Sequence, residues 1–527
     1  MQIQIYLFRL ILPNDEVGIL VITYDLAKRG ERPLYEYLYE SIKNDIISNV
    51  LHAGERMPSK RKLAQHLAVS LITVEGAYSQ LIAEGYIRSI ERRGYYVNDI
   101  AQLRDVRKRH EHDSVGVPRE SYALDSSIDQ DHQQKSALRL KHPIDMERER
   151  ASKSVDIDLS GRAPSKGLFP YDRWAFHVRK VLTNADEKVL VSESGAFGSR
   201  ALRKAIARFL LGYRGMEVNP DNVVIGAGSQ VLYQLIVQLI GRGHRYALED
   251  PGYGRLARIY RANDVTIAPI PLNEDGIELD SLRSSGASVA HVMPTHQYPT
   301  GQIMSISRRY ELLAWAAGDD ERFIIEDDHD SELQFSGRPI PSLQSIDAQQ
   351  KVIYLNTFTK SLGPAFRMSY MVLPDVLAQK FREHFGFYSC TANAIDQLAL
   401  ARFIESGEYE RHINRLRTHF RANATELARA MRQEKLTDLV LENAFAGSHG
   451  LLRVDGPVSA RELADAALEE GLLIEPLEDF LIGRADALDL SRSDYLDSRL
   501  FIDHGALSES NIGNCASSIA RAYQCCS

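Results

Sequence analysis

A lysine stands between two threonines and an arginine in the segment YLNTFTKSLGPAFRMSY, residues 354 to 370. The apolar residues before it predict a buried strand, so Lys360 is expected at a strand end in apolar surroundings. Burial disfavours the ammonium form and lowers the pKa of a lysine, whose neutral amine can then attack an aldehyde. Thr357, Thr359 and Arg367 offer the hydroxyls and the planar donor fork that suit a phosphate group.

A turn of small residues in IGAGSQVLYQL opens a predicted helix at Ser229 and Gln230. The free N–H groups and the dipole of a helix N-terminus attract an anion. Taken singly, such a turn is most often only a turn, and an isolated lysine is usually a surface charge. Taken together, the two segments indicate a phosphate site beside a reactive amine.

The acidic segment FIIEDDHDSELQF, residues 323 to 335, admits four interpretations: a metal site, a general base, a solvated turn or a cofactor contact. Strand alternation puts Asp327 and His329 on one face and Glu326 and Asp328 on the other. Two ligands leave a transition-metal site incomplete, so no metal is expected. The neighbouring acids are expected to cap the following turn.

Apolar runs alternate with helix-like segments from Asp156 to the end of the chain. This pattern predicts an α/β domain, residues 156 to 527, with a mostly parallel central sheet. In such sheets ligands bind at the carboxyl ends of the strands, where these runs carry polar residues and glycines. The runs are NVVIGAGSQ, YALEDPGYG, DVTIAPIPL, VAHVMPTHQYPTG, RFIIEDDHD and KVIYLNTFTK.

Residues 33 to 98 predict a small helical module with a hairpin. Leu34, Leu38 and Ile42 recur at helical spacing along a first helix. Pro58-Ser59 is typical of the start of a second helix, and a third helix follows a short turn. The next segment, YIRSIERRGYYV, predicts two short strands around a basic turn, so the module is expected to be a winged helix-turn-helix.

The composition limits the compartment and the partners. The chain has 527 residues, a formal net charge of -8 and 4 cysteines. Few cysteines favour a reducing compartment, so we expect a cytoplasmic protein, and no stretch reaches the ~20 apolar residues of a spanning helix. Any DNA contact must come from a local basic patch. Residues 1 to 32 are an extension of unassigned role, and residues 99 to 155 are expected to form a linker.

The string GERMPSKRKLAQHLAVSLITVEGAYSQLIAEGYI resembles the winged-helix DNA-binding domain of GntR-type bacterial regulators, which implies a double-stranded DNA operator as partner. At the start of the recognition helix, Leu71 and Ile72 replace the arginine usual in that family. Phosphate and base contacts must therefore come from other residues. The expected phosphate contacts are Lys60, Arg61, Lys62, Arg92 and Arg93, and the expected base contacts are Ser70, Thr73 and Tyr78.

Ordered motifs of the large domain resemble the fold-type I aminotransferases, which carry pyridoxal 5'-phosphate, over roughly residues 160 to 510. The motifs are GLFPYDRW, GSRALRKAIARFL, VVIGAGSQ, EDPGY, PTHQYPTG, IIEDDHDSEL and TFTKSLGPAFRMSY. With the N-terminal module, the chain is similar to the MocR/GabR subfamily of transcriptional regulators. Both resemblances imply a homodimer, because fold-type I sites borrow residues from a second subunit and GntR-type regulators bind two half-sites.

The same resemblance implies the roles of individual residues. Lys360 would form the Schiff base with the cofactor, and Asp327 would keep the pyridine nitrogen protonated. Tyr253 matches the aromatic residue that stacks on the ring, and Arg255 matches an arginine that receives a ligand carboxylate. The phosphate would be held by Thr357, Thr359, Arg367, Ser229 and Gln230.

Three positions depart from the family pattern. His329 replaces the tyrosine that hydrogen-bonds the phenolic oxygen of the cofactor; an imidazole can donate there, but it titrates near neutral pH. The stretch SESGAFG lacks a tyrosine often found there. The C-terminal arginine that binds a ligand carboxylate is matched only by Arg499, two positions early, with Phe501 in the expected slot.

The leading functional interpretation is a transcription regulator that binds DNA through residues 33 to 98. It would sense an amine or amino acid by aldimine exchange at Lys360. The alternative is a working aminotransferase with an accessory DNA-binding domain, which the loss of the tyrosine at position 329 disfavours. A cofactor-free regulator is a third interpretation, and the intact Asp327 and Lys360 argue against it.

Overall fold

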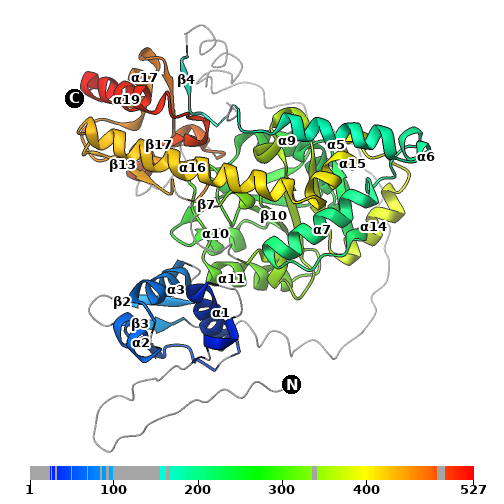
Figure 1. Ribbon diagram of the computed structural model, residues 1–527, viewed down its shortest axis with the longest axis horizontal. Coiled ribbons are helices and arrows are strands. Elements are labelled where there is room, and N and C mark those ends of the chain that lie inside the picture. Colours follow the sequence, from blue (N-terminus) through cyan, green and yellow to red (C-terminus); the bar gives the residue numbers. More distant parts are fainter. Residues whose placement is uncertain are drawn as a thin grey trace, which may run out of the picture.

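The chain folds into an N-terminal helical module, a large α/β domain and a C-terminal subdomain (Figure 1). The structure is a computed structural model. It describes residues 24, 26–29, 33–48, 50–67, 69–83, 86–90, 94–98, 155–161, 167–334, 341–444, 446–483 and 493–526. All but the last residue of the expected linker, 99 to 155, lies outside these described residues.

The N-terminal module is the predicted winged helix-turn-helix. Leu38 and Ile42 of the first helix and Val74, Ala77 and Leu81 of the third are buried in one cluster, as their spacing requires. Its three strands form an antiparallel sheet in the order β1-β3-β2. The elements are α1 (Leu34–Ile47), β1 (Arg56–Met57), α2 (Lys60–His66), α3 (Leu71–Ala83), β2 (Ile87–Ile90) and β3 (Gly94–Val97).

The packing of this module begins before Pro33. The Tyr24 hydroxyl donates a hydrogen bond to Asp45 Oδ2 at 2.7 Å. Leu26, in the 3-10 helix η1 (Leu26–Arg29), packs against the cluster of buried residues. The described part of residues 1 to 32 therefore belongs to the module and is not a separate extension.

The large domain is built on an eight-stranded sheet in the order β5-β12-β11-β10-β9-β6-β7-β8. Strands β11, β10, β9, β6 and β7 run parallel to one another, and β12 is antiparallel to both of its neighbours. The predicted α/β fold with a mostly parallel sheet is confirmed. The strands are β5 (Val223–Gly226), β6 (Arg245–Asp250), β7 (Thr266–Asn273), β8 (Gly276–Ile277), β9 (Val289–Val292), β10 (Phe323–Asp327), β11 (Val352–Thr357) and β12 (Ser369–Val372).

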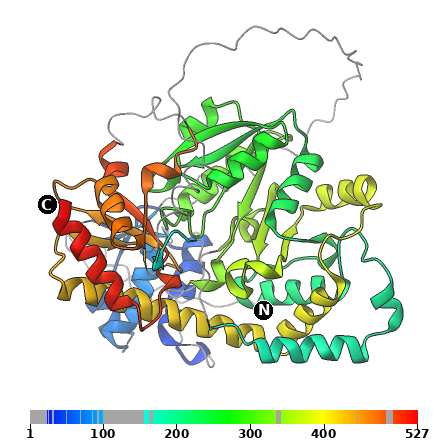
Figure 2. The same ribbon diagram turned by 90° about the horizontal axis from the view of Figure 1, so that it is seen from above.

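Helices cover both faces of this sheet (Figure 2). Ile325 packs with α8, α9 and α14 on one face, whereas its neighbour Ile324 packs with α10 and α11 on the other. Because consecutive strand residues serve opposite covered faces, the strands are apolar over most of their length and carry polar residues mainly at their ends. The helices are α5 (Tyr171–Asn184), α6 (Glu187–Val191), α7 (Arg200–Arg214), α8 (Ser229–Ile240), α9 (Gly254–Ala262), α10 (Leu279–Ser284), α11 (Ile306–Ala317), α12 (Leu343–Ile346), α13 (Thr359–Leu362), α14 (Asp375–Phe385) and α15 (Ala394–Glu405).

A 26-residue helix, α16 (Glu408–Gln433), runs from the large domain into the C-terminal subdomain (Figure 1). The subdomain has a sheet in the order β13-β14-β17-β16, and β15 pairs in parallel with β4 from the start of the large domain. Its elements are β13 (Leu439–Glu442), β14 (Gly450–Val454), α17 (Ala460–Glu469), β15 (Leu472–Leu473), β16 (Glu475–Pro476), α18 (Ser493–Asp497), β17 (Arg499–Ile502) and α19 (Ile512–Cys526), with β4 at Ile157–Asp158.

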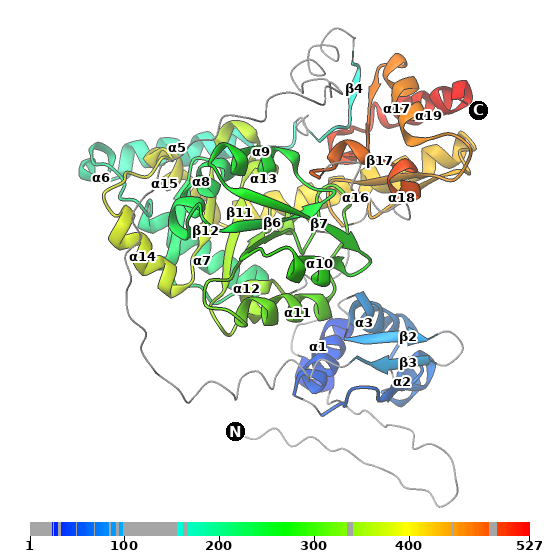
Figure 3. The same ribbon diagram turned by 180° about the vertical axis from the view of Figure 1, so that it is seen from behind.

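Helix α11 lies beside the N-terminal module (Figure 3). Ile306, at its start, is fully buried in the hydrophobic cluster of that module. Tyr310, one turn later, and Ile346 of α12 pack against the same cluster. One helix of the large domain therefore supplies part of the core of the N-terminal module.

The opposite side of α11 is tied to a loop of the large domain by Arg309, which is fully buried. Its guanidinium donates hydrogen bonds to the backbone oxygens of Pro294 at 2.5 Å, Met304 at 3.1 Å and Pro341 at 2.8 Å. Buried carbonyls without such donors carry a desolvation penalty. Arg309 thus fixes both ends of the loop between β9 and α11.

Replacing this arginine is expected to destabilise the large domain. Arg309→Met removes the side-chain donor of three backbone oxygens; the Pro294 oxygen still accepts from the Met304 N–H, and each buried carbonyl left without a donor costs about 1–3 kcal/mol. We expect the melting temperature to fall by more than about 5 °C. Arg258→Leu, a change at an exposed arginine of α9, is the control and should shift the melting temperature by much less. Equal shifts for the two variants in thermal melts would contradict this role.

Candidate functional site

Lys360 lies where the parallel strands end. β11 ends at Thr357 and the lysine follows in α13, while Asp327 is the last residue of the neighbouring β10. Lys360 Nζ donates to Asp503 Oδ2 at 3.2 Å. Burial alone lowers the pKa of Lys360, but the charges of Asp503 and Asp330 outweigh burial and the pKa is raised. The expectation of a lowered pKa is wrong, because two carboxylates distant in sequence lie beside the amine.

Asp327 is an ionised carboxylate with one oxygen to spare. Its Oδ2 accepts a hydrogen bond from the Tyr233 hydroxyl at 2.5 Å and lies 3.3 Å from His291 Nε2. Burial by itself raises the pKa of Asp327, but the hydrogen bond and charge of His291 and the charge of His329 lower it below the ordinary value. Oδ1 is buried and has no hydrogen-bond partner among the described residues. That oxygen can accept a hydrogen bond from a protonated ring nitrogen.

An anion cradle begins at the N-terminus of α8, whose first residues are Ser229 and Gln230. Arg367 Nη2 donates to the Ala227 oxygen just before this helix at 3.4 Å. A Cβ at Gly228, where φ is +92°, would lie 2.4 Å from Arg367 Nη2. A glycine at position 228 therefore lets the guanidinium lie against the start of the helix. The guanidinium and the N-terminus of the helix can then attract the same anion.

The hydroxyls of the strand end complete the cradle. Thr357 Oγ1 lies 2.7 Å from Thr359 Oγ1 and accepts a hydrogen bond from the Ser369 hydroxyl at 2.7 Å. The cradle, the spare oxygen of Asp327 and the Lys360 amine are the groups that the phosphate, ring nitrogen and aldehyde of pyridoxal 5'-phosphate require. The residues present therefore fit this cofactor.

Aromatic side chains form a wall beside the lysine. Tyr253 stands at the N-cap of α9 and lies close enough to Lys360 to act on its charge. Its ring centroid is 5.6 Å from that of Tyr298, in an edge-to-face arrangement. Tyr298 in turn lies 5.6 Å from the ring of Phe480 and 5.2 Å from that of Phe501. Such a wall excludes water and offers a flat surface to a ring.

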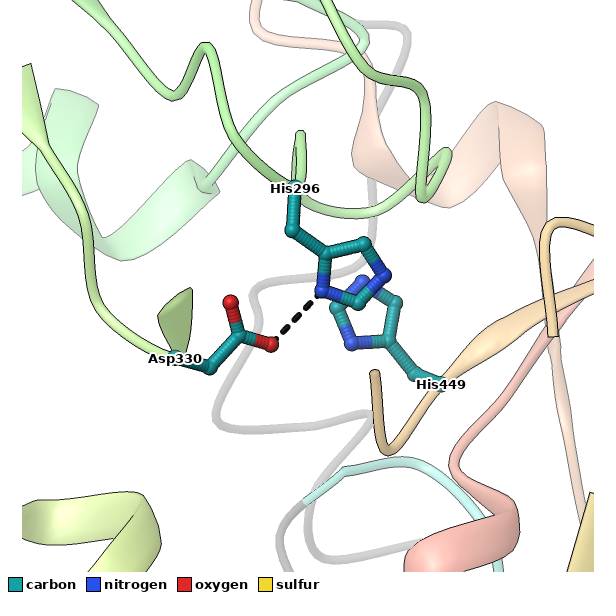
Figure 4. A group of neighbouring side chains, drawn as sticks. All are labelled: His296, Asp330 and His449. Carbon is teal, nitrogen blue, oxygen red and sulfur yellow. Dashed lines mark hydrogen bonds and ion pairs between the residues drawn. The ribbon is translucent and has the colours of Figure 1, made fainter. Parts of the chain in front are cut away.

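His329 belongs to a buried group of histidines around Asp330. Figure 4 shows His296, Asp330 and His449 pointing toward one another from three segments of the chain. His296 Nδ1 lies 2.6 Å from Asp330 Oδ2, and His329 Nε2 lies 3.7 Å from Asp330 Oδ1. The rings of His296 and His449 are 4.0 Å apart. Burial alone raises the pKa of Asp330, but the charges of His296 and His329 lower it, so the carboxylate is ionised.

This group changes the count of possible metal ligands. The sequence singled out Asp327 and His329 as two ligands, whereas the ligand atoms of His296, Asp330 and His449 all lie within 4.8 Å of one another. The described residues thus offer three of the four ligands that zinc takes, not two. Asp330 already pairs with His296, whose ring lies against that of His449.

The sequence predicted that the acids next to Asp327 cap the turn that follows them. This prediction is wrong for Glu326 and Asp328. Glu326 accepts hydrogen bonds from two N–H groups at the start of the distant helix α12, at 2.8 and 2.9 Å. Asp328 accepts from Arg214 Nη2 at 2.8 Å and from the Tyr354 hydroxyl at 2.7 Å. Both acids therefore hold the sheet to its neighbouring helices and strands.

The two arginines expected to receive a ligand carboxylate differ in their surroundings. Arg499 Nε donates to Glu442 Oε2 at 2.8 Å, so its charge is already matched by that carboxylate. Phe501, on the same face of the strand, packs toward Tyr298 instead. Arg499 is therefore not brought to Lys360, while Arg255 lies exposed in the first turn of α9.

Three of the predicted phosphate contacts, Lys60, Arg61 and Lys62, lie on α2. Arg61 and Lys62 are exposed, and Lys60 is partly buried, 3.9 Å from Glu75. Ser59 caps this helix by accepting a hydrogen bond from the Lys62 N–H at 3.3 Å. The helix therefore presents the charges of Arg61 and Lys62 toward solvent within the described part of the chain. Of the predicted phosphate contacts, Arg92 and Arg93 lie outside the described residues.

The recognition helix α3 corrects one expected base contact. Tyr78 is fully buried and its hydroxyl donates to the Pro58 oxygen at 2.8 Å, so it is a core residue and does not face a base. Ser70 accepts a hydrogen bond from the Thr73 N–H at 3.1 Å and lies 2.8 Å from its hydroxyl, so it caps the helix. Ile72, in the first turn of this helix, is 79% exposed.

Several residues of the site were missed from the sequence. Tyr233, His291, His449 and Asp503 touch Asp327, Asp330 or Lys360. The sequence analysis gave none of these four residues a role, because the segments that carry them were interpreted through other residues or not at all. Only Tyr233 had a signal, because it lies one helical turn after Ser229 in the segment IGAGSQVLYQL.

Comparison with known families agrees with both domains. Residues 34–97 match the family of bacterial regulatory proteins called gntR, and residues 176–488 match the family of class I and II aminotransferases. A winged helix fused to an aminotransferase-like domain defines a class of HTH-type transcriptional regulators. The chain belongs to the MocR/GabR subfamily of GntR-type regulators.

Individual relatives extend over almost the whole chain. It is 34% identical over 491 residues to the uncharacterized HTH-type transcriptional regulator YhdI of Bacillus subtilis, covering 93% of this chain and 96% of the relative. It is 28% identical to the probable rhizopine catabolism regulatory protein MocR of Rhizobium meliloti, covering 86% and 88%. The fold matches the Pyrococcus horikoshii kynurenine aminotransferase with a TM-score of 0.62 at 22% identity, covering 74% and 95%. Among the described helices, none has the length and apolar character needed to span a membrane.

Buried Glu332, near the cofactor site, makes stability depend on pH. Burial raises its pKa to about 8, well above the ordinary value of about 4.3. The native state holds a proton that the unfolded chain releases, so this contribution is complete below about pH 4.3 and is lost as the pH rises through about 8. We expect the melting temperature of Glu332→Gln to rise relative to the unaltered chain between about pH 5 and pH 8. Exposed Glu274→Gln is the control, and parallel curves for all three proteins would refute the assignment.

The exposed lysine of α2 is expected to act through DNA phosphates. Lys62→Ala should weaken binding by a similar factor for different duplexes and reduce the slope of log affinity against log salt by about 1. Anisotropy titrations at several salt concentrations measure both quantities. Lys380→Ala, on α14 of the large domain, is the control. A loss confined to one DNA sequence would show that Lys62 reads bases instead.

Proposed function

We propose that this protein is a DNA-binding transcription regulator that carries pyridoxal 5'-phosphate at Lys360 and senses a primary amine or amino acid there. The observation that supports it most is the buried, unpaired Oδ1 of ionised Asp327 beside the anion cradle and the lysine. The cofactor, when bound, supplies an aldehyde carbon with which primary amines condense reversibly. The proposal includes a homodimer on a double-stranded DNA operator, in which Lys60, Arg61, Lys62, Ser70 and Thr73 face the nucleic acid.

The chain's own residues divide the work at this site. Asp327 holds a proton on the ring nitrogen, and Tyr253 stacks on the ring. His329 donates to the phenolic oxygen in place of a tyrosine. Thr357, Thr359, Arg367 and the start of α8 with Ser229 and Gln230 hold the phosphate, and Arg255 receives the carboxylate of a ligand that has one.

A physical route connects the site to the DNA-binding module. The loop between β9 and α11 carries His296 and Tyr298, which line the site. Arg309 fixes that loop to α11, and Ile306 of α11 is buried in the module's core. A ligand that shifts the loop would therefore shift the helix that docks the module, which is the differential contact that coupling requires.

The proposal is tested first at the cofactor. The purified protein mixed with pyridoxal 5'-phosphate is expected to gain a visible absorbance band that Lys360→Ala lacks. At least one primary amine or amino acid should change that band and shift the affinity for operator DNA by about five-fold or more. In Ile306→Ser the ligand should still change the band while its effect on DNA affinity is lost.

The contrary outcomes are distinct. A DNA affinity that no amine alters would refute sensing. Steady conversion of an amino donor and a 2-oxo acid would establish the alternative, an active aminotransferase with an accessory DNA-binding domain. A protein that never gains the band would refute cofactor binding.

A further inference from the structure

Asp503 reaches the lysine from a different part of the chain. It follows β17 of the C-terminal subdomain and is buried, whereas Lys360 belongs to the large domain. Its Oδ1 accepts a hydrogen bond from the Gly505 N–H at 3.1 Å, and its own N–H donates to the Leu159 oxygen at 2.8 Å. Its Oδ2 then accepts from Lys360 Nζ at 3.2 Å. The carboxylate is thus held in place independently of the lysine.

The other groups around Lys360 reinforce this pair. Asp330, after β10, and Tyr253, before α9, also favour a positive charge on the amine. His449, before β14, opposes it, but burial lowers the pKa of His449 well below the ordinary value, so this imidazole is neutral. Among the described residues the carboxylates of Asp503 and Asp330 act on the lysine, and the imidazoles of His296 and His329 lie beside Asp330.

We propose that Asp503 holds Lys360 as an ammonium whenever the lysine is not bonded to the cofactor, and so withholds it as a base. The inference rests on the proposed function. When a ligand ammonium replaces Lys360 on the cofactor's aldehyde carbon, one C–N bond forms and the other breaks. Every proton that the ligand nitrogen loses is gained by Nζ, so the positive charge ends on Lys360 beside Asp503.

This pairing separates sensing from turnover. Transamination requires a neutral base that takes the proton from the carbon next to the ligand nitrogen, and an ammonium cannot accept that proton. Asp503 is therefore a positioning residue that lets the site bind amines while it suppresses their conversion. The regulator and the enzyme would differ at this site by one carboxylate that reaches the lysine from the C-terminal subdomain.

The test titrates Lys360 directly in the full-length protein without added cofactor. The rate of its acetylation by acetic anhydride, followed by mass spectrometry against pH, reports the neutral fraction of the amine. The unaltered protein should show a midpoint at or above the ordinary lysine value of about 10.4. Asp503→Asn should lower the midpoint by at least about one pH unit, and Asp503→Glu should restore it. Glu442→Gln, which removes a carboxylate paired with Arg499 from the same sheet, is the matched control and should leave it unchanged.

The second readout uses the protein loaded with pyridoxal 5'-phosphate. Release of 2-oxo acid from an amino acid in a single turnover should rise about ten-fold in Asp503→Asn at neutral pH, as the neutral fraction of Lys360 rises. A midpoint that is the same in Asp503→Asn, or one below about 9.5 in the unaltered protein, overturns the inference. The acetylation needs no cofactor. If the protein never gains the visible absorbance band, the proposed function is refuted, whereas the effect of Asp503 on the titration of Lys360 is still decided by the acetylation.

Discussion

The parallel alignment of β9, β10 and β11 is the constraint on which the site depends. In register, Ile324 of β10 lies between Ala290 of β9 and Val352 of β11. Parallel neighbours end at the same edge of a sheet, so each strand delivers its polar residues to one place. Asp327 and Lys360 meet there although they are far apart in the chain. The C-terminal subdomain closes this edge by bringing Asp503 and His449 to it.

Four of the buried acids at this edge, Asp327, Asp330, Glu249 and Glu332, fall into two groups according to their partners. Asp327 and Asp330 face histidines, and their pKa values are lowered. Glu249 and Glu332 have mostly neutral partners, and burial raises the pKa of each to about 8. Burial disfavours the charged form of all four acids. Asp327 and Asp330 are ionised because histidines face them, whereas Glu249 and Glu332 hold their protons more tightly. As a result, negative charge is concentrated at Asp327 and Asp330, and Glu249 and Glu332 behind them stay close to neutral.

Much of the fold could be predicted from the sequence because it is encoded locally. The spacing of Leu34, Leu38 and Ile42 indicates one face of a helix directly. Apolar strands between helices indicate a parallel sheet that is covered on both faces. Lys360 and Asp327 could be found for the same reason, since each closes an apolar run. The pKa of Lys360 could not, because it depends on Asp503, a carboxylate in another subdomain. Tyr78 was misassigned because a helix position alone does not tell a base-facing side chain from one that turns back to the Pro58 carbonyl.

The shared helix α11 has a consequence for how such proteins diversify. The loop that carries His296 and Tyr298, the buried guanidinium of Arg309 and the docked side chain of Ile306 form one mechanical unit of adjacent residues. A change of ligand preference made in that loop alters the support of the DNA-binding module at the same time. Chimaeras between relatives should therefore place their junctions outside residues 293 to 310. The loop beside the candidate site and the helix that contacts the N-terminal module then come from the same parent.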